Sequence, residues 1–335
     1  MASEIGVLGA GGWGTALAKV LADKGERVTL WCHGADSYRA IVEIRENPTY
    51  LPGIALPANI TATQALDQAV ARKDLVIYAL PSHVVRGVLA AAGAKLAAET
   101  MVLCGTKGLE EGSLKTMGEL FSELFGSARN HRHAFLSGPS FASEVARQLP
   151  AAVTVAAYDD TVAKSIQRIL STRHLRVYTS PDVIGVQIGG VVKNVIAIAA
   201  GVSDGLSLGH NARAALITRG LAEMTRLAVR MGADPLTLAG LPGLGDLILT
   251  CAGNLSRNRA VGLQIAAGRS LHEITGATRM IAEGVRNTRS LYDLAKRLEV
   301  EMPIVEQMYQ VLYAGKKPAE AVQDLMDRSL KPEAG

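Results

Sequence analysis

Aromatic side chains are scarce in this chain of 335 residues, where Phe, Trp and Tyr together make up 4%. Hydrophobic residues still reach 48% and charged residues 20%, which is within the range of globular proteins. Ala, Leu, Val and Gly must therefore fill the interior. Because domains average about 150 residues, a chain of this length is expected to form two.

Cysteine is also rare. Cys32, Cys104 and Cys251 are odd in number and far apart, which fits neither a disulfide framework nor a zinc-ligand pattern. We therefore expect a reducing, cytoplasmic environment and no metal site. Residues 1–4 lack a cationic region ahead of an apolar one, so no signal peptide is expected.

Sustained basic runs are missing too, although the formal net charge is +4. Lys and Arg are scattered among Asp and Glu, which argues against a nucleic-acid partner, whereas an anionic small molecule needs only a few local cations. The longest apolar stretch, residues 185–201, carries Lys193 near its middle, where a bilayer would penalise the charge. We expect a buried core helix there, and no membrane association.

Short apolar or β-branched runs alternate with helical patterns through the first half of the chain. The expected strands are 5–8, 28–31, 75–80, 101–104, 134–136, 152–156 and 175–178. The expected helices are 13–24, 37–45, 82–96, 114–125, 140–148 and 161–171. This alternation predicts an α/β fold with a Rossmann-like, doubly wound parallel sheet covered by helices.

The pattern changes after Pro181, where strand-like runs almost vanish and helical spacing continues to the end. Asp182 is a good N-cap candidate for the first of these helices. We therefore expect a dinucleotide-binding domain at residues 1–180 and an all-helical domain at residues 181–335. The tail after Leu330 is expected to fray.

A glycine-rich turn joins the first expected strand to the first expected helix. Its sequence, Gly9-Ala10-Gly11-Gly12-Trp13-Gly14, follows the GxGxxG pattern. Gly9 allows a tight turn, Gly11 leaves room for a pyrophosphate, and Gly14 allows close packing of helix and strand. A chance turn among 34 glycines is the alternative, but the strand–turn–helix context favours a dinucleotide site.

The cofactor is left open by the second strand. It ends in Cys32-His33-Gly34, without the acid that usually binds the ribose hydroxyls of NAD. No carboxylate there repels a 2′-phosphate, and Arg39 follows closely, so NADP or use of both cofactors is expected. Asp36 is near enough to keep NAD open.

Two polar segments follow expected strands. Lys107 follows the strand 101–104, at the edge where open α/β sheets bind ligands, although a solvated loop lysine would look the same. Residues 137–141 end another strand and open another helix, whose N-terminus could meet an anion.

Lys193 belongs to a ridge of otherwise small residues. The members of this ridge, spaced four apart, are Gly185, Gly189, Lys193, Ala197 and Gly201. Lys193 either transfers protons, which requires burial or a partner, or extends to the surface. Asp246, presented by a turn that contains Gly243 and Gly245, is the candidate partner, with a helix N-cap as the alternative.

Residues 256–259, Ser-Arg-Asn-Arg, precede a helical pattern. An N-capping Ser256, free N–H groups and the Arg257 guanidinium together describe a phosphate site. Surface ion pairing is the alternative.

At this point the chain resembles bacterial glycerol-3-phosphate dehydrogenases that use NAD or NADP. The matching segments are GAGGWGTALA from Gly9, PSHVV from Pro81, TKGLE from Thr106, SGPSFA from Ser137, IGVQIGGVVKNVIAIAAG from Ile184, NARAALITRGLAEM from Asn211, GLGDLILTC from Gly243, SRNR from Ser256 and EGVRNT from Glu283. The resemblance implies reversible reduction of dihydroxyacetone phosphate to sn-glycerol 3-phosphate for phospholipid synthesis. It also implies a homodimer and a second domain similar to the helical domain of 6-phosphogluconate dehydrogenase, serving substrate binding and dimerisation.

The resemblance also assigns roles to residues. Lys193 matches the proton donor and acceptor, oriented by Asp246, and Lys107 adds positive charge near the carbonyl oxygen or the phosphate. The matched substrate positions are Lys107, Gly138, Ser140, Lys193, Asp246, Ser256, Arg257 and Asn258. With Gly9, Gly11 and Gly14 of the turn, the cofactor positions are Gly12, Trp13, His33, Lys107, Ala142, Arg257, Ile281 and Glu283.

Two other functions are weighed against this one. A related reductase of another small keto acid is possible on fold grounds, but the phosphate-like segment at Ser256 argues against an uncharged substrate. A non-catalytic dinucleotide-binding protein would need the glycine turn but neither Lys193 nor Asp246.

Overall fold

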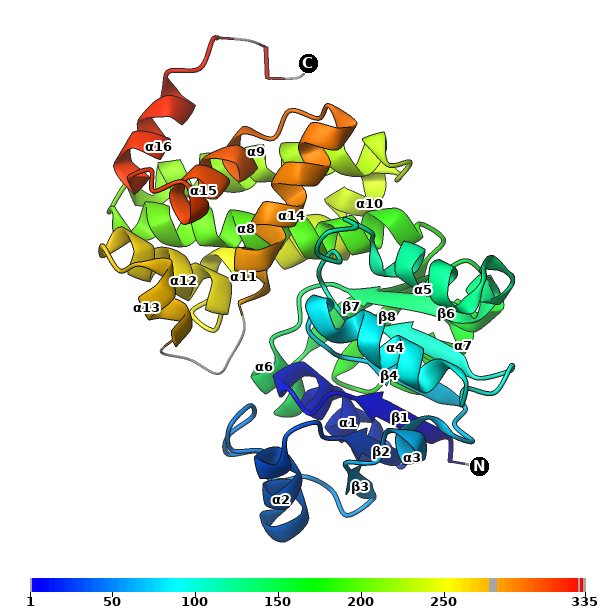
Figure 1. Ribbon diagram of the computed structural model, residues 1–335. Coiled ribbons are helices and arrows are strands. Elements are labelled where there is room, and N and C mark those ends of the chain that lie inside the picture. Colours follow the sequence, from blue (N-terminus) through cyan, green and yellow to red (C-terminus); the bar gives the residue numbers. More distant parts are fainter. Residues whose placement is uncertain (1, 277–281, 331, 334–335) are drawn as a thin grey trace.

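The computed structural model describes residues 2–276, 282–330 and 332–333, in a sheet-containing half and a helical half (Figure 1). The strands are β1 (Glu4–Leu8), β2 (Arg27–Trp31), β3 (Ile60–Thr63), β4 (Leu75–Tyr78), β5 (Met101–Cys104), β6 (His133–Ser137), β7 (Ala151–Ala157) and β8 (Leu175–Ser180). They form one sheet in the order β3-β2-β1-β4-β5-β6-β7-β8. The expected α/β fold with a Rossmann-like first half is confirmed.

Helices cover both faces of the sheet. Their bounds are α1 (Gly12–Asp23), α2 (Ala35–Ile44), α3 (Leu66–Val70), α4 (Val85–Gly93), α5 (Met117–Phe125), α6 (Ala142–Ala146) and α7 (Asp160–Leu170), with 3-10 turns η1 (Ser82–Val84) and η2 (Ser127–Arg132). Successive strand residues belong to opposite cores: Leu75 and Ile77 pack on the α1 and α7 side, whereas Val76 and Tyr78 pack on the α4 and α5 side. This alternation follows from the two-residue period of a strand.

One strand pair departs from the expected parallel sheet, because β7 runs antiparallel to β6. A parallel return needs a long crossover, but the connection holds only the five-residue α6. The chain instead turns back at Gly138, which has φ 130° and would place a Cβ 2.9 Å from Val153 Cα. β8 is parallel to β7. These two strands therefore end at the edge where the other six begin.

Several expected boundaries were wrong. Strand β3 was missed because Ile60-Thr61-Ala62-Thr63 is a short edge strand without an apolar run. The expected helix 114–125 begins at Met117, where Thr116 and Glu119 form a capping box. The expected strand 75–80 ends at Tyr78, and the expected helix 82–96 is η1 followed by α4, ending at Gly93. The expected helix 140–148 is only α6.

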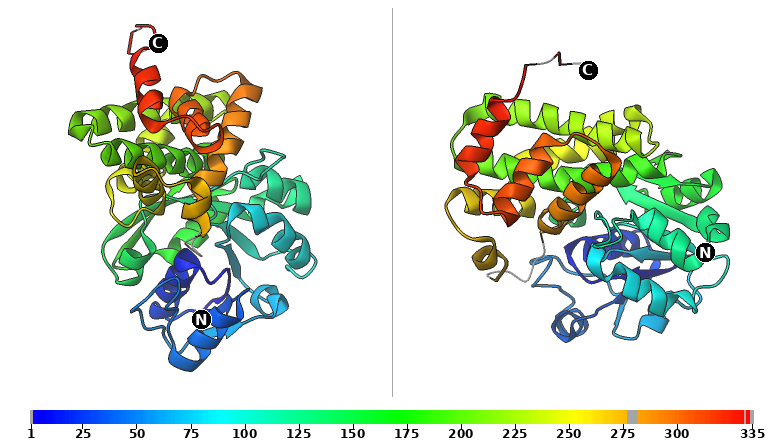
Figure 2. Two further views of the ribbon diagram at one scale, coloured as in Figure 1. Left: turned by 60° about the vertical axis from the view of Figure 1, so that its left-hand side comes forward. Right: turned by 45° about the horizontal axis from the view of Figure 1, so that its top comes forward.

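The second half is helical in the described residues. Its elements are α8 (Val183–Gly205), α9 (Gly209–Arg230), α10 (Pro235–Ala239), the π-helical η3 (Leu241–Gly245), α11 (Asp246–Ala252), α12 (Arg257–Ala266), α13 (Leu271–Gly276), α14 (Glu283–Leu298), α15 (Pro303–Tyr313) and α16 (Pro318–Met326). Figure 2 shows from two further sides that α16 lies far from the sheet. The side chain of Asp182 accepts a hydrogen bond from Gly185 N, so it caps α8 as expected.

Helix α8 is the centre of the helical half. It is long and apolar enough to cross a membrane, but 89% of its most apolar window is buried within the protein, as expected of a core helix. Its glycines let other segments approach: a Cβ would lie 2.3 Å from Pro242 O at Gly189 and 2.1 Å from Arg259 O at Gly201. The small-residue ridge therefore brings η3 and α12 close to α8.

The two halves share side chains across residue 180. Val183 and Val186 of α8 pack into the core that contains Tyr78 and Phe121, whereas Leu109 packs into the core of the helical half. A division into domains 1–180 and 181–335 stays a prediction, and the first turns of α8 are packed against the sheet.

Candidate active site

The glycine turn between β1 and α1 has the geometry that its sequence predicts. Gly9 has φ 111°, and a Cβ there would lie 2.6 Å from Ala79 O. A Cβ on Gly14 would lie 1.9 Å from Gly9 O, so only glycine allows α1 to begin this close to β1. Around Gly11, no atom of the described residues lies within 4 Å of a Cβ position. The backbone is therefore accessible to a ligand at this point.

An asparagine that the sequence reasoning missed holds this turn. Asn47, which is fully buried, donates from Nδ2 to Ala10 O at 2.8 Å and to Thr15 Oγ1 at 2.9 Å. It thereby fixes the loop between β1 and α1. Nothing in the sequence separates Asn47 from other loop asparagines, because its partners lie more than 30 residues away.

The residues around the turn fit a dinucleotide. Gly11 caps α1 without a side-chain hydrogen bond, which leaves N–H groups at the helix N-terminus for an anion. Trp13 Nε1 is buried and has no hydrogen-bond partner among the residues that the structure describes. A Cβ on Gly12 would lie 3.7 Å from that of Ala142, so these two expected cofactor positions are adjacent.

At the end of β2, His33 is exposed, and its ring centroid lies 5.7 Å from that of Trp31. The two residues that left the choice of cofactor open bind each other: Arg39 Nη2 lies 2.9 Å from Asp36 Oδ1, and both side chains are exposed. Neither charge is therefore buried near the turn, and the pair can rearrange when a ligand binds.

Lys193, Asp246 and Lys107 form a cluster that joins the two halves. Lys193 Nζ lies 2.5 Å from Asp246 Oδ1 and donates to Thr250 Oγ1 at 3.1 Å. Lys107 Nζ lies 2.7 Å from Asp246 Oδ2 and donates to Gly138 O at 3.0 Å. Asp246 is 1% and Lys193 7% exposed. Lys193 therefore does not extend to the surface, and Asp246 is not an N-cap, since it is the first residue of α11 after the cap Gly245.

The two lysines share one carboxylate, and the close contact shifts the pKa values of Lys193 and Asp246. Burial lowers the pKa of Lys193 to about 8; Asp246 opposes this shift and Lys107 adds to it. Burial would raise the pKa of Asp246, but the ammonium groups of Lys107 and Lys193 outweigh it and lower that pKa. The cluster therefore holds one net positive charge and a lysine that can exchange a proton near neutral pH.

The segment at Ser256 lies at the N-terminus of α12. Ser256 caps the helix by accepting from Arg259 N, and Arg257 is exposed. Arg259 instead donates to Asp204, with Nε at 2.7 Å from Oδ2, so the two arginines of the segment differ in environment. Arg259 therefore has the structural ion pair that was the alternative, whereas the Arg257 side chain has no hydrogen bond or ion pair among the described residues.

A chain of asparagines connects this segment to the lysines. Asn258 donates to Asn194 Oδ1 at 2.8 Å, and Asn194 Nδ2 lies 3.3 Å from Lys107 O. Gly284 N donates to Asn258 Oδ1 at 3.0 Å, which brings the start of α14 to the same place. Within the described residues, Asn258 Nδ2 therefore has one N–H without an acceptor.

Glu283, the first residue of α14, faces the dinucleotide-binding half. Its carboxylate accepts from Ser82 N at 3.3 Å and from Ser82 Oγ at 2.9 Å. Burial raises the pKa of Glu283, and the two hydrogen bonds from Ser82 oppose that shift. The expected cofactor position Ile281 lies outside the described residues.

The structure brings most expected site residues to one region. Ser140 Oγ donates to Gly138 O at 2.9 Å, and Lys107 Nζ donates to the same carbonyl oxygen. Sequence reasoning missed Thr250, which is one helical turn beyond Asp246 and donates to Asp246 O at 2.6 Å. The spacing of four could have indicated it. It also missed Asn194, which adjoins Lys193, and Asn287.

Comparison with known proteins covers both halves. A family model for the NAD-dependent glycerol-3-phosphate dehydrogenase N-terminus matches residues 4–163, and one for the C-terminus matches residues 182–323. The chain is 52% identical over 333 residues to a glycerol-3-phosphate dehydrogenase [NAD(P)+] from Geobacter sp. (strain M21), covering 99% of each chain. It is 53% identical over 327 residues to that of Anaeromyxobacter dehalogenans, covering 98% of each. The crystal structure of glycerol-3-phosphate dehydrogenase from Coxiella burnetii superposes with a TM-score of 0.93 at 40% identity, covering 98% of this chain and 99% of that one.

Proposed function

The chain belongs to the NAD-dependent glycerol-3-phosphate dehydrogenase family, and on this premise we propose how its residues interconvert dihydroxyacetone phosphate and sn-glycerol 3-phosphate with NAD or NADP. The observation that carries the proposal is the buried contact of Lys193 and Lys107 with Asp246. Burying these charges costs free energy, and catalysis gives a reason for that cost.

Lys193 is the proposed proton donor and acceptor. In the direction of reduction its ammonium gives a proton to the substrate oxygen, while the nicotinamide, when bound, supplies the hydride. Asp246 holds Nζ in place, and Thr250 supports it from the same helix. Lys107 adds a second positive charge beside the oxygen that becomes an alkoxide, because its Nζ contacts the same carboxylate.

Arg257 and the N-terminus of α12 are the proposed phosphate site. The N–H groups of residues 257 and 258, at the start of the helix, and the guanidinium of Arg257 offer both dipole and charge to a phosphate. Asn258, Ser256, Gly138 and Ser140 are the remaining proposed substrate contacts. Binding energy at the phosphate would orient the distant ketone carbon.

The cofactor is proposed to bind along the glycine turn. Gly9, Gly11 and Gly14 shape the turn, and Gly12, Trp13, His33, Ala142 and Glu283 are proposed contacts, together with Lys107 and Arg257. Since Asp36 is engaged with Arg39 and exposed, we propose that both NAD and NADP are accepted. Ile281 remains a proposed contact from the sequence alone.

The cellular setting is likewise proposed. A cytoplasmic homodimer that supplies the glycerol backbone of phospholipids, without nucleic-acid or membrane partners, agrees with the scattered charges and the burial of α8. Domains at residues 1–180 and 181–335, the second for substrate binding and dimerisation, agree with the change from sheet to helices.

Steady-state reduction of dihydroxyacetone phosphate, with NADH and NADPH side by side, tests this function. We expect oxidation of both cofactors that depends on the phosphorylated ketone. Equal turnover of unphosphorylated dihydroxyacetone would favour another keto substrate, and no oxidation of either cofactor would favour a non-catalytic dinucleotide-binding protein.

A further inference from the structure

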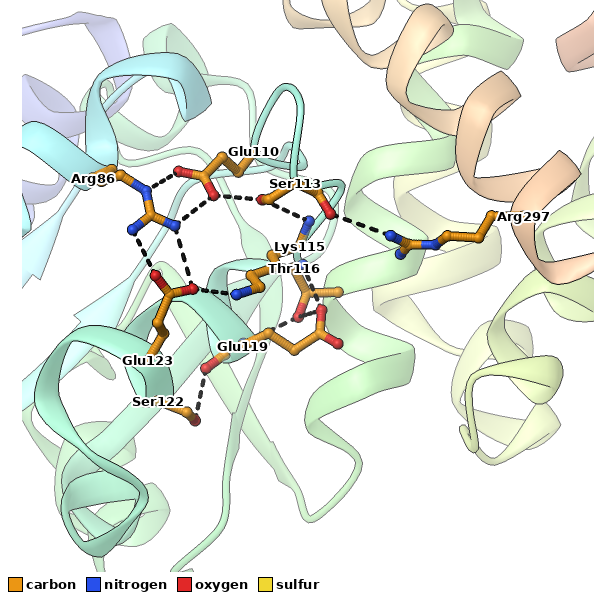
Figure 3. Close-up of polar contacts among 10 residues, drawn as sticks. Arg86, Glu110, Ser113, Lys115, Thr116, Glu119, Ser122, Glu123 and Arg297 are labelled. Atoms are coloured by element: carbon orange, nitrogen blue, oxygen red, sulfur yellow. Dashed lines mark hydrogen bonds and ion pairs between the residues drawn. The ribbon is translucent and has the colours of Figure 1, made fainter.

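The loop after β5, residues 105–116, carries Lys107 and is held from both halves of the protein. On the sheet side, Arg86 of α4 lies between two carboxylates, with Nε 2.5 Å from Glu110 Oε1 and Nη1 2.7 Å from Glu123 Oε1 (Figure 3). On the helical side, Arg297 of α14 donates to Ser113 O at 3.3 Å. These contacts hold the far part of the loop.

The main chain of Lys107 itself is held by two amides. Its carbonyl accepts from Asn287 Nδ2 at 3.1 Å and lies 3.3 Å from Asn194 Nδ2. The two asparagines belong to different helices, α14 and α8, and they are 1% and 5% exposed. A carbonyl with two amide partners from separate helices has little freedom to move.

Within the described residues, the side chain of Asn287 makes no other hydrogen bond. Its Nδ2 binds Lys107 O, and its Oδ1 is buried without a partner there. A buried, half-satisfied amide is unfavourable compared with an apolar side chain of the same shape. Asn194, in contrast, also donates to Gly190 O and accepts from Asn258. The contact with Lys107 is therefore what an asparagine at position 287 contributes.

We propose that Asn287 is a positioning residue: by holding the Lys107 carbonyl, it keeps Lys107 Nζ between Gly138 O and Asp246 Oδ2. This role rests on the proposed function, because it acts through the lysine cluster. Asn287 itself contacts neither Lys193 nor Asp246 in any hydrogen bond of the described residues.

Displacing Lys107 would change the pKa of Lys193. Among the described residues, the charged or titratable groups that face Lys193 are Asp246 and Cys251 of α11 and Lys107 of the loop. When Lys107 moves away, Lys193 loses a repelling charge and gains more of the Asp246 carboxylate, so the pKa of Lys193 rises. Reduction needs protonated Lys193. The pH at which the rate of reduction falls is therefore higher when Lys107 is displaced.

The test replaces Asn287 with leucine, which has a similar shape and no donor. In reduction of dihydroxyacetone phosphate, we expect Asn287→Leu to lower kcat about tenfold, the scale of one lost hydrogen bond. We also expect the alkaline limb of the pH profile to move upward. Arg297→Ala is the matched control, since it removes a contact between the same helix and the same loop away from Lys107; its pH profile should match the wild type.

Two results would contradict the positioning role of Asn287. An Asn287→Leu enzyme with wild-type kcat and pH midpoint overturns the proposal, and so does an equal loss in both variants with unmoved midpoints. If Asn287→Leu does not fold, Asn287→Ala enters the same comparison. A wild-type chain that oxidises neither NADH nor NADPH contradicts the proposed function instead, whereas an active wild type with an unaffected variant contradicts only the role of Asn287.

Discussion

At the residue scale, the proposed chemistry depends on three charged side chains that are buried in contact with one another. Lys193 and Lys107 each take one oxygen of Asp246, which leaves one net positive charge. Such a site stabilises a negative charge that develops on a substrate oxygen, because the dipoles and charges are already oriented. The same arrangement lowers the pKa of Lys193 to about 8, mainly through burial.

Replacing Lys193 removes both the proton and its titration. Lys193→Ala should lower kcat about 10² to 10⁴-fold with cofactor affinity intact. In the wild type, reduction needs the ammonium, so its rate should fall as pH rises through about 8, whereas oxidation needs the amine and should rise there. Initial rates from pH 6 to 10 in both directions, with a fluorescence titration of NADH, check this. Near-normal turnover in the variant would remove Lys193 from the mechanism.

The two arginines of the segment at Ser256 should differ sharply. Arg257→Ala should raise KM for dihydroxyacetone phosphate about 10 to 100-fold, the equivalent of a lost charge-assisted hydrogen bond. Arg259→Ala breaks the ion pair with Asp204 and should lower the melting temperature with KM unchanged. Steady-state kinetics and thermal unfolding of both variants separate the effects. An unchanged KM in Arg257→Ala would place the phosphate elsewhere.

Site residues with a local signal could be predicted from sequence, and residues known only through distant partners could not. Ser256 follows capping rules and sits at the start of a helical pattern. Lys193 stands out in an apolar helix. Asn47 and Asn287 act on carbonyls 37 and 180 residues away, so their roles arise only when the chain folds.

At the element scale, close contact between helices depends on glycine. Gly201 of α8 faces α12, and a Cβ there would lie 2.1 Å from Arg259 O and 3.0 Å from Gly262 Cα. Both are backbone atoms, so the two helices would have to move apart. The periodicity of α8 predicted the ridge of small residues but not the segment that packs on it.

Gly201→Ala should therefore lower the free energy of unfolding by about 1 to 3 kcal/mol, as overpacking does. Gly87→Ala is a matched control, because Gly87 also lies inside a helix, α4, and no described atom lies within 4 Å of its Cβ position. That control should be neutral or stabilising by up to about 1 kcal/mol. Urea unfolding measures both, and equal stabilities would contradict the packing argument.

Elements with clear periodicity were predicted to within a few residues, and those set by tertiary contacts were not. The run Met101–Cys104 is strand β5 at both ends as expected. Strand β3 depends on pairing with β2, and its alternating threonines carry no strong signal. The direction of β7 depends on the short connection at Gly138, which an alternation of strands and helices does not reveal.

At the scale of the whole molecule, one buried carboxyl couples stability to pH. Glu223 of α9 is 2% exposed and accepts from Ile304 N at 2.7 Å and Val305 N at 3.3 Å, at the start of α15. Burial raises its pKa to about 7, although the two N–H groups oppose this. The folded state therefore favours the protonated carboxyl.

The stability from this group is fully present below the unfolded pKa of about 4.5 and is lost as pH rises through about 7. The shift corresponds to about 3 kcal/mol. We expect Glu223→Gln to reduce the difference in unfolding free energy between pH 5 and pH 8.5 by about this amount. Urea unfolding of both proteins at the two pH values measures it. An identical pH dependence would show that Glu223 does not titrate in this range.

The reversed direction of β7 and β8 makes the length of α8 set the distance between the sheet edge and Lys193. Since β8 ends at the edge where the first six strands begin, α8 starts there and runs back along the sheet, with Val183 and Val186 in its core. Lys193 lies ten residues beyond Val183, or about 15 Å along the helix axis, beside Asp246. One residue inserted before it would rotate the lysine by about 100°. The position of the Lys193 amine, the proposed proton donor, is thus fixed by the number of residues before it, and this stretch of the chain can change its side chains far more readily than its length.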